Sequence, residues 1–157
     1  MKKFAAHYLI TDDDRFLKNA ILHADEDGTP LEYIDTSNDL QEIAQLIFHN
    51  GILISNLVFS KNSNTIPKNN NGDSLEAVIR HYCKNKNRLT IQDLIVLAQQ
   101  IQEHFTEMKI PEIISELSQT LLNKGFSKQN LPGIFLLSGT DLINLHFTSK
   151  TQLKKIL

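Results

Sequence analysis

The sequence predicts an α+β fold in which β-strands at both ends of the chain flank about three inserted helices. Residues 1–60 alternate short apolar runs with polar turns, and residues 74–125 contain three amphipathic segments with capping residues. Residues 131–157 return to short apolar runs. A chain of 157 residues can bury a core without disulfide bonds, so these parts are expected to form one domain.

The N-terminal part, residues 1–60, is predicted to be an antiparallel meander. Strands are expected over residues 4–11, 16–24, 31–34, 46–48 and 52–54. Asp27 and Gly28 predict a hairpin turn before the third of these strands, because glycine adopts positive φ without steric cost. The sequence His-Asn-Gly at residues 49–51 predicts another turn, between the last two strands.

Three helices are predicted, over residues 74–83, 90–105 and 111–124. The second has the strongest signals. Thr90 can cap it, Asp93 favours its positive end, and its apolar residues repeat at helical spacing. Ser74 is a candidate cap for the first helix, Pro111 suits the first turn of the third, and Gly125 suits its end.

Two non-helical segments surround the predicted helices. An Asn-rich linker, residues 61–73, is expected to join the N-terminal strands to the helical insert without regular structure. After the helices, residues 134–137 predict a buried strand and residues 142–147 a second strand. Residues 152–157 form a short amphipathic end that can pair at the edge of a sheet.

Composition excludes several classes of function. A net charge of −2 and a pI near 6.3 give no electrostatic reason to expect a nucleic-acid partner. No segment has the roughly 18 apolar residues of a membrane span, and the apolar run near the N-terminus is too short for a signal peptide. With the single cysteine Cys83 there is no intrachain disulfide, so a reducing cytoplasm is the expected location.

Several segments resemble the amidohydrolases, the metal-dependent hydrolase superfamily. At the front these are residues 3–10, 19–22, 27–29, 31–34 and 50–58. At the back they are residues 102–105, 110–114, 132–137, 145–148 and 153–157. In the family, a strand like residues 50–58 leads through Pro-Gly into an Asn-x-His-x-His metal motif. This chain has Ser55 and Asn56 at the Pro-Gly positions, Phe59 at the Asn position, and Lys61 and Ser63 at the two His positions.

The resemblance implies a particular fold and the absence of the family's metal site. It implies that the N- and C-terminal segments form one antiparallel β-sandwich, with most of the family's barrel missing between them. A lysine ammonium cannot bind zinc, and a serine hydroxyl is a poor replacement for imidazole, so Lys61 and Ser63 imply a chain without the metal site. A complete barrel also needs about 200 residues or more.

The residues alone suggest few other candidates for chemistry, and each has a structural explanation. His81 and Cys83 are one residue apart, which separates their side chains by roughly 200° on a helix. Cys83 lacks an oxyanion element, so a thiol at a helix end is the simpler interpretation. Gly72–Ser74, a faint echo of the family's Gly-Thr-Asp-Ser motif, fits a helix start, and residues 138–141 fit a turn.

The remaining histidines are His7, His23, His49, His104 and His146. For His7, His23 and His49, which lie in predicted β-segments, cross-strand or surface packing is the expected role. The basic run at residues 84–88 is expected to be a solvated helix end or turn. No catalytic, metal-binding or cofactor-binding residue is therefore predicted, and no cofactor.

The sequence thus favours a non-catalytic, amidohydrolase-like structural or protein-interaction module, a pseudoenzyme. A homodimer is expected, because removing a barrel would expose apolar surface. Three alternatives stay open: a regulatory subunit of a complete amidohydrolase, a residual metal-dependent enzyme, and an internally deleted product without a selected role.

Overall fold

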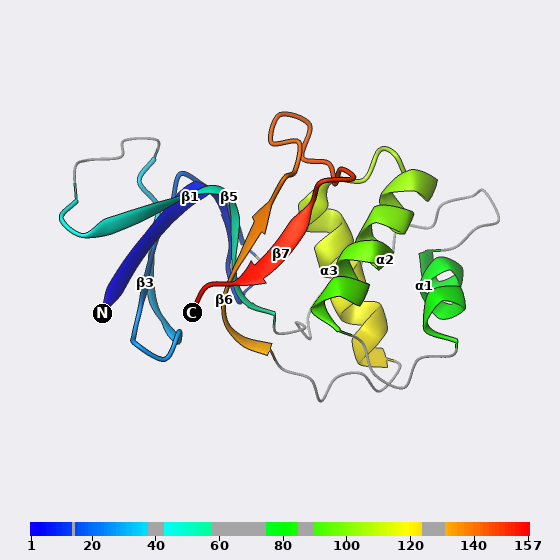
Figure 1. Cartoon of the computed structure of the whole chain (residues 1–157), viewed down its shortest axis with the longest axis horizontal. Helices are drawn as coiled ribbons and strands as arrows, with labels where there is room; N and C mark the ends of the chain where they lie inside the picture. Colours follow the sequence, from blue (N-terminus) through cyan, green and yellow to red (C-terminus); the bar gives the residue numbers. More distant parts are fainter. Residues whose placement is uncertain (14, 38–42, 58–74, 85–89, 124–130) are drawn as a thin grey trace.

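The computed structural model describes residues 1–13, 15–37, 43–57, 75–84, 90–123 and 131–157. These residues form a seven-stranded sheet with three helices packed against one of its faces (Figure 1). The strands are β1 (Lys2–Ile10), β2 (Phe16–Lys18), β3 (Ile21–Ala24), β4 (Pro30–Ile34), β5 (Leu46–Leu57), β6 (Leu131–Ser138) and β7 (Gln152–Lys155). The helices are α1 (Leu75–Cys83), α2 (Ile91–His104) and α3 (Ile110–Asn123). None of these helices is long and apolar enough to cross a membrane.

The two ends of the chain share this sheet. Its strand order is β4-β3-β1-β5-β6-β7, with β2 paired to β1 beside β3. The junction between the two parts is the antiparallel pair of β5 and β6, in which Ile54 lies opposite Phe135. The helices lie between β5 and β6 in sequence, so the predicted α+β class, with helices inserted between N- and C-terminal strands, is confirmed.

The arrangement of the strands differs from the prediction. All described strands belong to one sheet, so a sandwich of two facing sheets is not confirmed. The purely antiparallel meander is wrong for one pair, because β1 and β5 run parallel. After β1 the chain builds β2, β3 and β4 on one side and then crosses to place β5 on the other side. The sheet is therefore mixed.

The expected turn at residues 49–51 is also wrong, because β5 continues through it as one strand. Ala6 pairs with His49 and Tyr8 pairs with Ile52, so β5 contains one residue more than β1 between these two positions. Gly51 takes up the extra residue with φ +148°. Asn-Gly sequences suit a β-bulge as well as a turn, because both require unusual backbone angles.

Two other predicted strands are interrupted or absent. Residues 16–24 form two short strands instead of one, and Asn19 between them has φ +51°. Residues 142–147 form a turn. The Asp141 carboxylate accepts hydrogen bonds from the backbone N–H groups of Ile143 (3.0 Å) and Asn144 (3.1 Å), which bends the chain. A single bridge between Asp141 and His146 closes this turn.

The helices agree closely with the prediction. Thr90 caps α2 in a capping box: its hydroxyl accepts from the Asp93 backbone N–H at 3.2 Å, and its own N–H donates to the Asp93 carboxylate at 2.8 Å. Pro111 occupies the second position of α3. The predicted linker over residues 61–73, the Ser74 cap and Gly125 lie outside the described residues.

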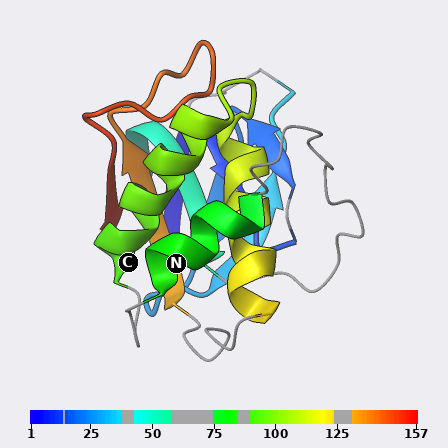
Figure 2. The same cartoon turned by 90° about the vertical axis from the view of Figure 1, so that its right-hand side faces the viewer.

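Both faces of the sheet carry a hydrophobic core. Figure 2 shows the three helices in front of one face. The core between them and the sheet includes Ile52, Ile54, Phe135 and Leu137 from strands and Ile79, Ile95, Leu97, Ile101, Ile110 and Ile113 from helices. The core on the opposite face consists of Phe4, Ala6, Leu9, Ala20, Leu22, Ala24, Leu53 and Ile134.

The C-terminus closes the second core. The Leu157 carbonyl accepts a hydrogen bond from the Ile134 N–H at 3.0 Å. The Leu157 backbone also lies against Gly28 in the β3–β4 hairpin, where an added Cβ would come within 3.0 Å of it. The sheet therefore curls, so that the C-terminal residue of the chain contacts the β3–β4 hairpin near the opposite edge of the sheet.

Candidate functional site

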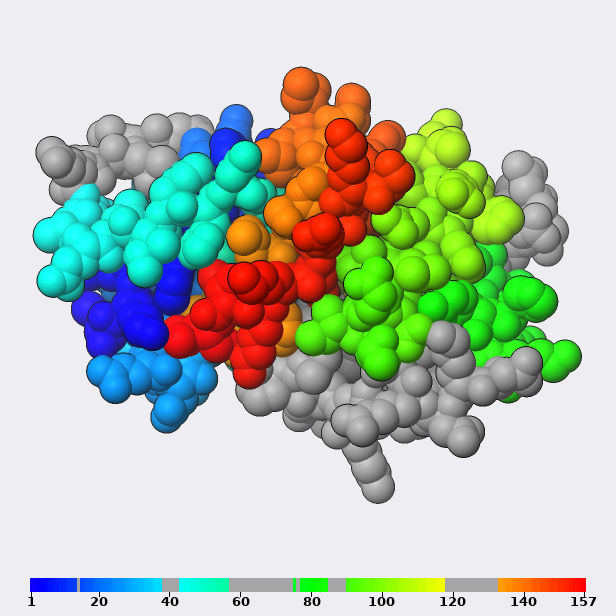
Figure 3. Space-filling model, in the orientation of Figure 1, coloured from blue at the N-terminus to red at the C-terminus, as the bar shows by residue number. Residues whose placement is uncertain are grey.

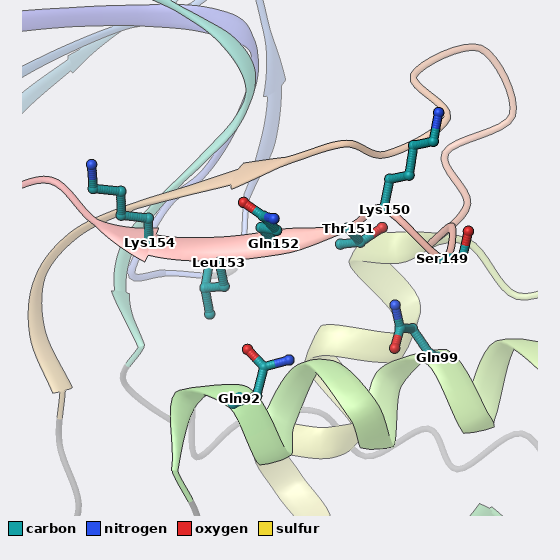
Figure 4. A pocket seen from close by; sticks show the side chains of 8 residues that line it. All are labelled: Gln92, Gln99, Ser149, Lys150, Thr151, Gln152, Leu153 and Lys154. Carbon is teal, nitrogen blue, oxygen red and sulfur yellow. The ribbon is translucent and has the colours of Figure 1, made fainter.

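A groove runs between β7 and α2 and has a volume of about 460 Å³. Residues 149–154 form one wall, and Gln92 and Gln99 of α2 form the other (Figure 4). In the space-filling view, the C-terminal segment (red) lies at the surface beside α2 (green) (Figure 3). The groove therefore follows a strand on one side and a helix on the other.

Hydrogen bonds hold the two walls of this groove in place. The Gln99 side-chain N–H donates to the Thr148 carbonyl at 2.8 Å, which ties α2 to the connection before β7. Thr151 fixes the start of β7, because its hydroxyl accepts from the Thr148 N–H at 2.8 Å and its own N–H donates to the Thr148 carbonyl at 3.2 Å. Leu153 packs against the helix-side core. The groove is thus preformed.

Among the strands that the structure describes, β7 is the last on this side of the sheet, and part of its backbone faces away from β6. The Ile156 N–H donates to the Ile134 carbonyl at 2.8 Å, and Lys155 lies opposite Phe135. In an antiparallel pair, successive residues alternate between bonding the partner strand and facing away from it. The backbone groups of Leu153 and Lys155 therefore point away from β6, as edge-strand groups available to another chain.

The side chains that line this groove are suited to binding more than to bond chemistry. Apart from Leu153 they are Gln, Ser, Thr and Lys, and the lining contains no His, Cys, Asp or Glu. The hydroxyls of Ser149 and Thr151 therefore have no general base beside them in the lining. Two lysines, Lys150 and Lys154, belong to the strand wall of the groove, and their side chains point away from α2 (Figure 4).

A second polar cluster lies where β1, β4 and β5 come together, and it forms a chain of hydrogen bonds. The Tyr33 hydroxyl donates to the Asp12 carboxylate at 2.8 Å, so the Ser55 hydroxyl, 2.6 Å away, donates to Tyr33. Burial raises the pKa of Tyr33 to about 12, while the hydrogen bond with Ser55 acts in the opposite direction. Because Ser55 is completely buried, no substrate reaches it, and the cluster is structural.

We expect Tyr33→Phe to lower the free energy of unfolding by about 1–3 kcal/mol at pH 7, because Ser55 would lose a buried partner. The folded-state pKa of Tyr33 lies above its ordinary value of 10.0. Its contribution to stability is therefore complete below pH 10 and falls as the pH rises toward 12. Urea unfolding from pH 7 to 11 measures both effects.

The control for Tyr33→Phe is Tyr8→Phe, which keeps the stack of that ring on Phe16 at 4.9 Å between centroids. We expect this variant to unfold at nearly the wild-type urea concentration and to keep the wild-type loss of stability above pH 10. Equal unfolding curves for Tyr33→Phe and Tyr8→Phe would contradict the structural role of the cluster.

The candidates singled out from the sequence are dispersed. Cys83 is buried at 8% exposure against the helix-side core, whereas His81 is exposed on α1. Among the described residues, no three His, Cys, Asp or Glu side chains come together in a way that could hold a metal ion. Ser138 is the last residue of β6, and residues 139–141 lie in the connection that follows it. Lys61, Ser63, Gly72–Ser74 and most of the basic run lie outside the described residues.

The histidines that the structure describes in detail have packing roles. The His7 ring contacts Phe48 edge-on with centroids 5.3 Å apart, and the His49 ring stacks on Phe4 at 5.9 Å. Burial lowers the pKa of His49, which favours the neutral ring. His23 lies 3.2 Å from the Glu32 carboxylate across the β3–β4 hairpin.

The groove residues other than the strand itself were not predicted. Residues 152–157 were expected to pair at a sheet edge, and β7 occupies that place. Gln92 and Gln99 are seven residues apart, which puts them on one face of α2. Lys150 and Lys154 are four positions apart, and an even spacing suits one face of an extended segment. From the sequence alone these spacings do not predict a groove, because only the fold brings α2 and β7 together.

A second unpaired edge lies at the start of β5. Residues 46–49 pair with β1 on one side, whereas β6 pairs with β5 only from Ile52 onward among the described residues. Ile47 and Phe48 in this segment are 46% and 51% exposed. The backbone groups of an exposed apolar edge of this kind can pair with another strand.

Comparisons of this chain with protein-family models, with curated proteins and with solved structures give no match. The resemblance to amidohydrolases therefore rests on the sequence segments described above.

Proposed function

We propose that this chain is a non-catalytic protein-interaction module that takes up an extended segment of a partner protein as an additional strand beside β7. The observation that carries this proposal is the position of β7 at the end of the sheet with a preformed groove between it and α2. Strand addition gives affinity through main-chain hydrogen bonds, and the groove gives specificity through alternate side chains.

The contacts around the groove support this function. The outward-facing backbone groups of Leu153 and Lys155 supply both donors and acceptors for a new ladder. Gln92 and Gln99 offer side-chain amides on the opposite wall. Since Gln99 and Thr151 hold the walls in position, a partner would order few groups of this chain when it binds, which favours affinity.

We also propose that the chain derives from an amidohydrolase-type β-domain without its metal site. The order of its segments and the residues Lys61 and Ser63 at the family's histidine positions support this origin. The sharing of one sheet by both chain ends is consistent with it. Elemental analysis that found stoichiometric zinc, together with amide hydrolysis lost on metal removal, would replace this proposal with a residual enzyme.

Lys155→Pro is the sharpest test of strand addition. Proline removes the N–H that faces away from β6 and leaves the N–H groups that bond β6 intact. Peptides selected from a displayed library on the wild-type protein are expected to bind Lys155→Pro at least tenfold more weakly. The control, Lys155→Ala, removes the same side chain but keeps the N–H, and should bind within about twofold of wild type.

Two results would reject the proposal. One is equal binding of the selected peptides to the proline and alanine variants. The other is a set of backbone amide chemical-shift changes, on peptide addition, that lie away from β7 and α2. Thermal unfolding of both variants checks that each is folded before binding is compared.

We infer that a second copy of the chain covers the apolar edge at the start of β5. Two such edges can pair antiparallel about a two-fold axis, so each copy offers the same surface to the other. Ile47→Lys should convert a dimer into a monomer by light scattering, since a lysine on an edge strand opposes pairing. Leu31→Lys on β4, where Leu31 is 57% exposed, is the control and should stay dimeric. A monomeric wild type at high micromolar concentration would reject this inference.

A further inference from the structure

We propose that the partner of the β7–α2 groove is an acidic extended segment whose carboxylates alternate along the added strand, opposite Lys150 and Lys154. This inference rests on strand addition at β7 and adds the chemical nature of the partner. It follows from the direction of the side chains along β7, from the positive charges of the two lysines, and from the backbone N–H and C=O groups at the outer edge of the strand.

The side chains along this wall separate into two rows. Lys150, Gln152 and Lys154 point away from α2, whereas Leu153 points toward it (Figure 4). A strand added beside β7 would place alternate side chains in these same two directions. One row of the partner would therefore meet the lysines, and the other row would meet α2.

The outer row is positive. Lys150 and Lys154 are both exposed, and neither forms an ion pair with another residue that the structure describes. The groove lining holds no carboxylate that would compete for them. Opposite charges on neighbouring strands stabilise the pairing, and like charges oppose it. Carboxylates in the outer row of the partner would thus be selected over lysine or arginine.

Within the groove lining, the inner row is neutral. Gln92 and Gln99 present amide groups from α2, and Leu153 supplies the apolar contact between them and the strand. Serine, threonine, asparagine or glutamine in the inner row of the partner can hydrogen-bond these amides. The preferred sequence therefore alternates acidic residues with small neutral polar ones.

A protein strand satisfies this site better than a nucleic acid does. Phosphates would pair with Lys150 and Lys154, but a nucleic-acid backbone has no regular series of N–H and C=O groups. It would leave the outward-facing backbone of Leu153 and Lys155 without ladder partners. The net charge of −2 also opposes binding of a polyanion over a wider surface.

The experiment compares two peptides that differ only in charge: one of alternating glutamate and threonine, and one with glutamine in place of each glutamate. At low salt we expect the glutamate peptide to bind wild type about tenfold more tightly, and this difference to shrink as salt increases. Lys155→Pro should weaken both peptides, because both need the same ladder.

A charge reversal then tests the two lysines. In K150E combined with K154E, we expect the glutamine peptide to become the tighter of the two. The control combines K2E with K18E, which changes net charge equally on exposed positions of β1 and β2 and should keep the wild-type order.

The outcomes separate the two proposals. If both peptides bind wild type equally and Lys155→Pro weakens both, strand addition stands and the acidic partner is wrong. If neither peptide binds and the proline has no effect on any selected peptide, the proposed function fails. A single-stranded oligonucleotide that displaces the glutamate peptide and binds wild type as tightly would overturn the assignment to a protein segment.

Discussion

Gly51→Ala is expected to lower the free energy of unfolding by roughly 3–5 kcal/mol, combining the cost of a strained backbone with that of overpacking. Gly51 has φ +148°, a backbone conformation that residues with a Cβ rarely adopt. An added Cβ would lie 2.3 Å from the Leu137 carbonyl oxygen on β6. Since domains are stable by only about 5–15 kcal/mol, this change removes a large share of the total.

Urea unfolding followed by circular dichroism measures this loss. The control is Asn50→Ala, the neighbouring and exposed residue of β5, which should change the free energy of unfolding by less than about 1 kcal/mol. An unfolding midpoint of Gly51→Ala equal to that of Asn50→Ala would show that the bulge tolerates a side chain. That result would contradict the close approach of the β6 backbone to Gly51.

The bulge at Gly51 also explains one limit of prediction from the sequence. Asn50 and Gly51 have the same backbone preferences in a turn as in a bulge, so the sequence alone does not distinguish the two. What decides between them is β1, which pairs with β5 on both sides of the bulge. That pairing is a long-range contact, and the pattern of residues within one strand does not reveal its partner.

The helices could be predicted because their signals are local. Thr90 and Asp93 form the expected capping box, and the apolar residues of α2 face the core as their spacing indicated. The failure at residues 142–147 has a local cause as well. The Asp141 side chain competes for the backbone N–H groups of the following residues and leaves Ile143 92% exposed.

The candidate site could be predicted only in part. The short amphipathic segment at residues 152–157 predicts an edge strand, and β7 is that strand. The other wall comes from Gln92 and Gln99, which are about fifty residues earlier in the chain. Nothing in the local sequence connects a glutamine on a helix with a lysine on a strand, so the groove depends on the fold.

Gln102→Leu is expected to lower the free energy of unfolding by about 2–4 kcal/mol. The reason is that the buried Gln102 side chain hydrogen-bonds backbone groups in two separate connecting segments. Its N–H donates to the Met108 carbonyl at 2.8 Å, in the loop between α2 and α3. Its carbonyl oxygen accepts from the Phe147 N–H at 3.4 Å, in the connection that leads to β7. Leucine has a similar volume but satisfies neither group.

The matched control for this change is Gln100→Leu. Residue 100 lies two positions earlier on α2, roughly 200° around the helix, and is partly exposed. We expect this control to stay within about 1 kcal/mol of wild type in urea unfolding. Gln102→Leu should also weaken peptide binding at β7, because Phe147 and Thr148 position the start of that strand. If Gln102→Leu were as stable as Gln100→Leu, Gln102 would not be the link that joins the helices to the β6–β7 connection.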